Sequence, residues 1–357
     1  MLLLRAQPVS NASELKAALQ SAISLEHSTI PPYLTAYYTL KGNSSSVVYA
    51  RDVVIRNVIV EEMLHMTLAA NILNAIGGKP KFADPDFIPK YPGPLPMGIG
   101  EDDGPAPGTP LIVGLKRYSR ETVKNVFMAI EEPEKPFDIP NISALLMAGG
   151  PRQERFQTIG QFYASIKEQI RQEGDVLFKD ADPDRQVRGW FKPNEEPEIK
   201  DVESALRAID IIVEQGEGTP KRPLDFQGDF PHFYRFQELY LGKRLMRDPS
   251  SELGVAYDPQ RPITIDERAD VIQMVDNPGE LDLTAPANLL IRRLSNECDR
   301  VYTKLLRALE IAFNGTPKKM SDALSTMFEL KTVAEELLER PLAGGGFAGP
   351  RFRYMID

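Results

Sequence analysis

Apolar residues recur at steps of three and four along most of the chain, the spacing of one buried face of an α-helix. The pattern predicts helices over these segments: one opening at Glu14 behind a cap at Asn11 or Ser13, Arg51–Gly78, Ser119 to Glu131 or Glu132, Pro151–Glu173, Asp201–Gln215, one beginning at His232, Ala287–Phe313 and Lys318–Glu339. Several long helices without a multi-strand pattern predict an all-α fold. Pro31 and Pro32 should kink or interrupt the first helix.

The stretch Arg51–Gly78 places two strongly polar side chains in the middle of an apolar pattern. Glu62 and His65 are three residues apart, so they project from nearly the same side of a helix. A buried carboxylate is costly unless something pairs with it, and a metal ion would pair with both residues at once. Glu-x-x-His on an inward helix face is typical of carboxylate-bridged di-metal bundles. The alternative is a core histidine hydrogen-bonded to Glu62.

Glu26 is a second acidic residue on an apolar stripe, this time in the first helix. The turn 42–46 between the first two long helices implies antiparallel neighbours, an arrangement that lets Glu26 and Glu62 face each other. Both are therefore candidate metal ligands. The alternative for each is a buried ion pair with an arginine, such as Arg56 or Arg235.

A complete di-metal site needs further ligands from later helices. Glu214 and Glu217 lie three residues apart at the end of the fourth long helix, and His232 begins the next one. Glycines beside Glu217 allow the backbone to approach a site closely. For Glu214 the alternative is a solvated helix edge, and for His232 a capping or surface role. His27 lies off the face that carries the first candidate ligand, and we expect it to be exposed to solvent.

Three tyrosines, Tyr33, Tyr37 and Tyr163, are candidates for lining a substrate pocket or gating a radical, with aromatic core packing as the favoured alternative for each. Residues 79–150 contain long irregular stretches rich in Pro and Gly, which predict a crossover long enough to act as a lid. We expect residues 1–250, including this crossover, to form one four-helix bundle. Residues 251–357 should form a helical extension packed on it, either completing the bundle or forming a dimer surface.

Composition narrows the function classes. The 357 residues include 42 basic and 51 acidic ones, and the net charge of -9 gives no electrostatic reason to propose nucleic-acid binding. The single cysteine, Cys298, excludes an intrachain disulfide and cysteine-based metal sites, so any metal needs oxygen and nitrogen ligands. The motifs of triad hydrolases, phosphate-binding loops and dinucleotide-binding folds do not occur. Without a signal-peptide layout or a membrane-spanning apolar run, we expect a cytoplasmic protein.

Six segments together resemble the ferritin-like proteins related to iminophenylpyruvate dimer synthase, the family named for an enzyme of violacein biosynthesis. The segments are LEHSTIPPYLTAYY (25–38), IVEEMLHMTLAANILNAIGGKP (59–80), IGQFYASI (159–166), IVEQGEG (212–218), HFYRFQEL (232–239) and GPRFRY (349–354). The resemblance spans most of the chain. In the larger relatives from bisindole pathways this module is part of a much longer polypeptide, so the coupling of two indole-3-pyruvate imines does not carry over with the fold.

The resemblance implies a ferritin-like bundle, and on matching positions it points to a set of ligands: Glu26, Glu62, His65, Glu217 and His232. One departure is Gln161, where some relatives are expected to have Glu. If that position supplies a ligand in relatives, this chain would bind metal more weakly or with a different set of ligands.

Together the residues and the resemblance favour a non-haem iron oxidoreductase of secondary metabolism, either mono- or dinuclear. It would use O2 or peroxide on a small aromatic or amino-acid-derived substrate. The expected cofactor is one or two iron ions, with another divalent metal as an alternative. Expected partners are a small-molecule substrate, a second copy in a homodimer and a partner enzyme of a biosynthetic pathway, but no nucleic acid or membrane. The alternatives are a non-catalytic ferritin-like protein for metal storage and a structural helical bundle.

Overall fold

The computed structural model describes residues 11–96, 109–133, 137, 139, 159–219 and 221–356. The α-helices are α1 (Ala12–Thr39), α2 (Ser45–Val48), α3 (Arg56–Ala75), α4 (Arg120–Thr122), α5 (Met128–Ile130), α6 (Ile159–Glu173), α7 (Val202–Gly216), α8 (His232–Leu241), α9 (Leu289–Phe313) and α10 (Met320–Leu338). Two π-helical segments are η1 (Tyr49–Ile55) and η3 (Val123–Phe127), and short 3-10 turns are η5 (Gly174–Phe178), η6 (Pro183–Arg185), η7 (Pro278–Glu280), η8 (Pro286–Asn288) and η9 (Pro317–Lys319). The prediction of a helical fold is confirmed.

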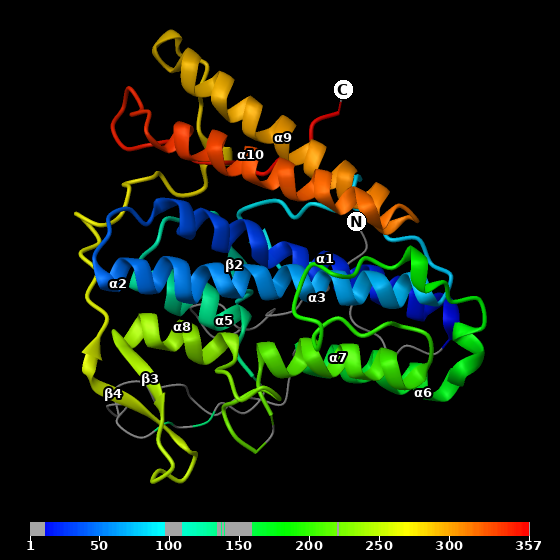
Figure 1. The fold of residues 1–357 in the computed structure, drawn as a ribbon. Helices are drawn as coiled ribbons and strands as arrows, with labels where there is room; N and C mark the ends of the chain where they lie inside the picture. Colours follow the sequence, from blue (N-terminus) through cyan, green and yellow to red (C-terminus); the bar gives the residue numbers. More distant parts are fainter. Residues whose placement is uncertain are drawn as a thin grey trace.

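The helices are arranged in three layers around the α1–α3 pair (Figure 1). The α9–α10 hairpin lies on one side, with α10 against α1 and α9 against α3. On the other side α6 packs against α1, and α7 packs against α3 and α6. Since each of these helices has one apolar face, the pair in the centre is covered from both sides, and its polar side chains are removed from water.

Two small antiparallel ribbons were not predicted. Strand β1 (Gly93–Pro94) pairs with β2 (Ile112–Val113), and β3 (Lys243–Arg247) pairs with β4 (Val255–Pro262). Strands β1 and β2 have only two residues each, and the last four residues of β4 are all exposed. Neither ribbon therefore shows the sustained alternation of apolar and polar residues that identifies a strand from sequence.

Helix α1 begins where the sequence predicts, because the side chain of Asn11 accepts hydrogen bonds from the backbone of the first turn. The predicted interruption at Pro31 and Pro32 is wrong: the helix continues through both for 28 residues. Proline at position 32 cannot donate to the carbonyl of Ser28. The hydroxyl of Tyr91 donates to that carbonyl instead, at 2.6 Å, and replaces the missing backbone bond.

The predicted helix Arg51–Gly78 corresponds to three consecutive segments, α2, η1 and α3. Ser44 caps the first of them by accepting from the backbone of Val47. The π-helical turn of η1 leads directly into α3, which carries Glu62 and His65. Gly77, with a φ of 73°, ends the run as predicted, since this left-handed conformation costs glycine little.

The expected exposure of His27 is wrong, because α9 covers this part of α1. The side chain is 4% exposed, and its Nε2 is 2.8 Å from the hydroxyl oxygen of Tyr302. Its ring also lies 4.8 Å from that of Phe87. Burial lowers the pKa of His27 to about 3, so the ring is neutral and belongs to the interface between the hairpin and the bundle.

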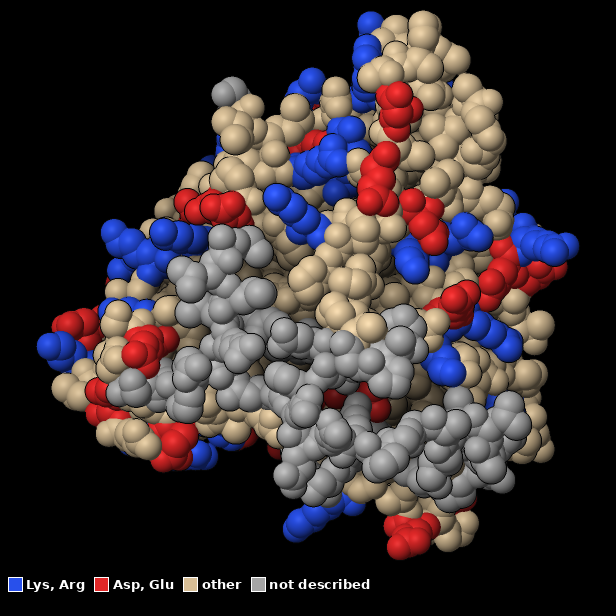
Figure 2. Space-filling view, turned by 180° about the vertical axis from the view of Figure 1, so that it is seen from behind, with Lys and Arg blue, Asp and Glu red and all other residues tan. Residues whose placement is uncertain are grey.

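Parts of the predicted crossover, residues 97–108, 134–136, 138 and 140–150, lie outside the described residues, as does the predicted start of the third long helix, residues 151–158. Within the described chain, none of the helices combines the length and the apolar character needed to cross a membrane. On the described part of the face seen in Figure 2, basic and acidic side chains are interspersed.

Candidate metal centre

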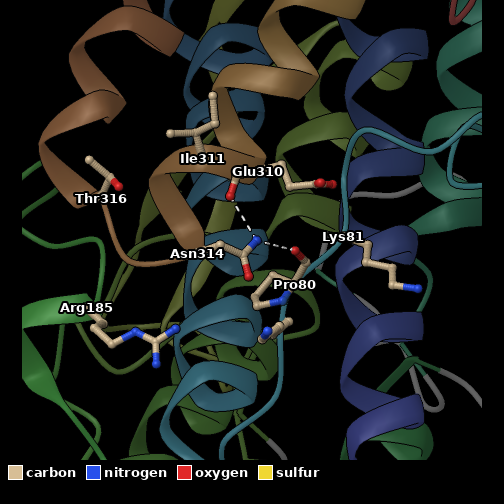
Figure 3. Close-up of a pocket in the computed structure, with 8 residues that line it drawn as sticks. Pro80, Lys81, Arg185, Glu310, Ile311, Asn314 and Thr316 are labelled. Atoms are coloured by element: carbon tan, nitrogen blue, oxygen red, sulfur yellow. Dashed lines mark hydrogen bonds between the residues drawn. The ribbon is translucent and has the colours of Figure 1, made fainter. Parts of the chain in front are cut away.

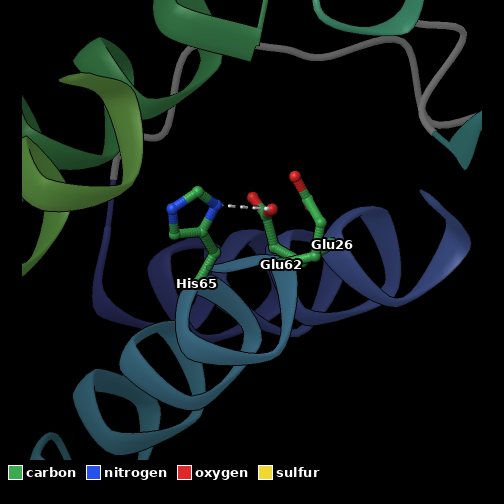
Figure 4. A group of neighbouring side chains, drawn as sticks. All are labelled: Glu26, Glu62 and His65. Atoms are coloured by element: carbon green, nitrogen blue, oxygen red, sulfur yellow. Dashed lines mark ion pairs between the residues drawn. The ribbon is translucent and has the colours of Figure 1, made fainter. Parts of the chain in front are cut away.

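Two groups of buried acidic and histidine side chains meet inside the bundle. Glu26 from α1 joins Glu62 and His65 from α3, and these three side chains converge in Figure 4. The second group consists of Glu62, Glu131 and His232. In each group the ligand atoms lie within 4.8 Å of one another, and all five residues are at most 6% exposed. Glu62 belongs to both groups, which is the position of a carboxylate that bridges two metal ions.

The structure thus brings together four of the residues predicted from sequence, and adds Glu131. This residue follows the short helix α5 directly, and it is one of two consecutive glutamates before Pro133. No Glu-x-x-His spacing marks it. The only available signal was an acidic residue at the end of a predicted helix, a common feature of solvated helix ends.

Hydroxyl groups hold the two carboxylates that are not shared. Tyr163 of α6 donates to Glu26 at 2.5 Å, and Tyr33 of α1 donates to Glu131 at 2.6 Å. Each bond occupies one carboxylate oxygen and leaves the other available to a metal ion. Both tyrosines are fully buried, as the core-packing alternative predicts, and each also binds a candidate ligand.

His232 is held at one ring nitrogen and open at the other. Its Nε2 lies 2.9 Å from Glu61, which also binds Arg235 at 2.8 Å. Its Nδ1 lies 2.8 Å from Glu62 Oε1 and 3.4 Å from Glu131 Oε2, yet makes no hydrogen bond of acceptable geometry. A buried nitrogen without a hydrogen bond, aimed at two carboxylates, is the arrangement that a metal ion satisfies.

His65 is arranged in a similar way, with one ring nitrogen bound to a neighbouring side chain and the other directed at a carboxylate of its own group. Nε2 lies 2.9 Å from the amide oxygen of Gln215 in α7, and Nδ1 lies 3.6 Å from Glu26 Oε2. The ring is stacked with that of His232, with centroids 5.4 Å apart. The two imidazoles therefore present the same nitrogen, Nδ1, to neighbouring halves of one centre.

The charges also favour a cation. Burial, followed by repulsion from Glu131, raises the pKa of Glu62 to about 8. Burial lowers the pKa of His232, but the nearby carboxylates outweigh it and raise this pKa well above its usual range. Among the described residues, no lysine or arginine forms an ion pair with Glu26, Glu62 or Glu131. Arg235, considered as a partner from sequence, pairs with Glu61 instead.

The residues therefore fit a divalent metal pair. Three carboxylates and two imidazoles are the donor types of ferritin-like di-metal centres, with one carboxylate fewer than the four that such bundles use. Metal ions would neutralise the buried carboxylates, of which Glu62 has a raised pKa, and they would use the open nitrogen of His232.

The other predicted ligands do not join either group. Glu217 accepts a hydrogen bond from the backbone nitrogen of Gly160 at 2.8 Å, near the start of α6. Glu214 is half-buried on α7, and burial raises its pKa. Gln161, where we expected some relatives to have Glu, is half-buried on α6 and lies outside both groups. From the same helix, Tyr163 donates a hydrogen bond to the candidate ligand Glu26.

Tyr37 is also separate from the centre. It packs edge-on against Tyr38, with ring centroids 5.6 Å apart, and the ammonium of Lys331 lies 5.6 Å from its ring. Its surroundings are thus those of the α1–α10 contact.

A groove of about 550 Å³ lies elsewhere, between the end of α3 and the end of α9 (Figure 3). Asn314 donates to the carbonyls of Pro80 and Glu310 there, while Lys79 and Arg185 contribute charge to the lining. No residue of the two metal-ligand groups lines it, so this groove is not the entrance to the candidate centre.

With this geometry established, the chain can be placed among known proteins. A ferritin-like family model matches residues 19–241, a range that contains all five candidate ligands. The chain belongs to the ferritin-like family, as its segments indicated.

A dichlorochromopyrrolate synthase from Lentzea aerocolonigenes is 22% identical over 391 residues; the match covers 97% of this chain and 36% of that protein. The chain thus spans about a third of the length of this relative. A ferritin-like protein from Caulobacter vibrioides, known from a crystal structure, has the same fold: the TM-score is 0.63 at 22% identity, covering 98% of this chain and all of that one.

Proposed function

We propose that the protein is an iron-dependent oxidoreductase that uses O2 or peroxide to oxidise a small aromatic or amino-acid-derived substrate. The observation that carries the proposal is the carboxylate Glu62 shared by two buried groups, each with its own glutamate and its own histidine. Glu26 and His65 would hold one ion, and Glu131 and His232 the other. Bound iron supplies one-electron redox chemistry and coordination positions for an oxygen species, which none of these side chains supplies alone.

The residues around the ligands support catalysis by fixing their positions. Tyr33 and Tyr163 each hold one carboxylate through a buried hydrogen bond, and Thr29 donates to Glu62 at 3.0 Å. Such bonds keep the ligands in place when coordination changes during a reaction. The surrounding core excludes water, which protects reactive species from side reactions.

Similarity to a dichlorochromopyrrolate synthase supports a role in small-molecule biosynthesis. The substrate and the enzyme that supplies it are part of the proposal, since the chain covers 36% of that relative. A reactive precursor delivered by a partner enzyme would fit a centre that is buried in the bundle.

The test is the metal content of the purified protein, measured by mass spectrometry before and after anaerobic loading with Fe²⁺. We expect one to two irons per chain in the wild type and loss of iron in a Glu62→Ala, His65→Ala double variant. Glu214→Gln is the matched control, because this carboxylate lies outside both groups and should leave iron content unchanged.

Oxygen consumption with aromatic and amino-acid-derived substrates then tests catalysis. Turnover that disappears in the double variant supports an oxidoreductase. Bound iron without substrate-dependent oxygen consumption, in an assembly large enough to enclose mineral, would favour storage instead. No iron after anaerobic loading would refute both and leave a hydrogen-bonded polar core.

A further inference from the structure

The two histidines of the candidate centre bind chemically different groups through Nε2, the ring nitrogen that points away from the candidate ligands. His232 has a carboxylate behind it, Glu61, which is fixed in turn by Arg235 at 2.8 and 3.0 Å. His65 has a neutral amide behind it, that of Gln215. In other respects the halves match, since each contributes one glutamate and one histidine and shares a third ligand.

The orientation of the Gln215 amide is set by Glu195, a buried residue of the loop before α7. Its Oε1 accepts from Gln215 at 3.3 Å, from the ammonium of Lys192 at 3.2 Å and from Gln227 at 2.5 Å. A reversed amide would place two acceptor oxygens against each other. The amide oxygen therefore faces His65, whose Nε2 must carry the proton.

The same argument applies on the other side. The carboxylate of Glu61 can only accept, so Nε2 of His232 donates, and Nδ1 is the nitrogen that can bind a metal ion once it has released its proton. The donor strength of the two Nδ1 atoms then differs. A carboxylate behind a ligating histidine makes its ring more basic than a neutral amide does, and partners of this kind alter metal affinity by about 10- to 100-fold.

We propose that Glu61 and the Gln215–Glu195 pair are positioning residues that make the two halves of the centre unequal. The half formed by Glu131 and His232 binds its ion first and more tightly. The half formed by the other glutamate and histidine binds the second ion more weakly and exchanges it. This inference rests on the proposed function, because it requires that the centre binds metal.

The experiment is an anaerobic titration of metal-free protein with Fe²⁺, followed by calorimetry and checked against a competing chelator. The wild type should show two binding events of different affinity. Glu61→Gln keeps the shape of the side chain but removes its charge, so the tighter event should weaken by about tenfold or more while the weaker one stays unchanged.

A charge-conserving exchange tests the other half. The double variant Gln215→Glu, Glu195→Gln exchanges the two side-chain groups. A carboxylate then faces Nε2 of His65, an amide faces that carboxylate, and the net charge does not change. The weaker event should tighten by about tenfold. Glu196→Gln is the matched control: this neighbouring buried carboxylate binds only the backbone nitrogens of Gly189 and Trp190 among its described contacts.

Thermal melting of each metal-free variant identifies any that fail to fold, and rescue of the tighter event by Glu61→Asp separates charge from shape.

A single bound ion that is weakened by Glu61→Gln and unaffected by Gln215→Met would also agree with the inference. Two equal events in the wild type, or the reverse pattern in the variants, would overturn it while leaving the proposed function intact. A wild type that binds no Fe²⁺ would overturn the proposed function and this inference together.

Discussion

The metal-free protein should lose stability as the pH rises through neutrality, because one buried carboxyl group, that of Glu62, depends on a proton. Glu62 has a pKa of about 8 in the fold and an ordinary value of 4.5 when unfolded. Between these values the folded chain keeps a proton that the unfolded chain releases, so stability falls with rising pH. At about 1.4 kcal/mol per unit, the loss from this one group approaches roughly 5 kcal/mol by pH 8.

The histidines act in the same direction. The pKa values of His65 and His232 are both raised above 6.5, so the stability that they contribute is fully present below that pH. It is lost as the pH rises through their values in the fold. Bound metal reverses the trend, because it takes the place of these protons and binds more tightly as they leave.

The assay is thermal unfolding of chelator-treated protein at pH 5.5, 7 and 8.5, with and without added metal. Glu62→Gln, which carries no titrating proton, should flatten the pH dependence and melt higher than the wild type at pH 8.5, by on the order of 5–10 °C. The exposed Glu252→Gln serves as control and should follow the wild type. A metal-free wild type whose melting temperature stays level or rises over this range would refute the reasoning.

Three further substitutions test the surroundings of the centre by urea unfolding of metal-free protein. Tyr163→Phe removes the hydroxyl that donates to Glu26 and should cost about 1–3 kcal/mol; an unchanged midpoint would contradict this. Arg235→Met leaves the half-buried Glu61 without its arginine and should cost about 1–3 kcal/mol, less at a pH low enough to protonate the carboxylate. Gly218→Ala, at a φ of 90°, should cost about 1–3 kcal/mol and also weaken Fe²⁺ binding in the titration, because this turn precedes α8.

The sequence was sufficient to predict the long helices of the bundle, because each of them has a single apolar face. The same pattern placed Glu62 and His65 correctly, since two polar residues in an apolar stripe are visible without knowing the neighbours. Glu131 was missed because it lies just beyond a helix end, where acidic residues are ordinary. Its role depends on contacts with α8 and α1, which lie about 100 residues away in the chain and leave no local pattern.

His27 shows the opposite failure. Its position off the ligand face of α1 was predicted correctly, but the side of a helix away from one partner is exposed only if nothing else covers it. Here α9 does, and Tyr302 lies 275 residues from His27. Glu217 similarly has the glycines and the charge expected near a site, yet its carboxylate serves the backbone of Gly160. Only the packing of whole helices decides such cases.

The membership of Glu62 in both ligand groups has a consequence for how this protein can change over evolutionary time. A substitution at Glu26 or at Glu131 alters one of the two groups and leaves all ligands of the other group in place. A substitution at Glu62 removes a ligand from both halves in a single step. In the proposed metal centre, the two outer glutamates can therefore change one at a time in different lineages, whereas loss of the shared glutamate affects both metal positions together.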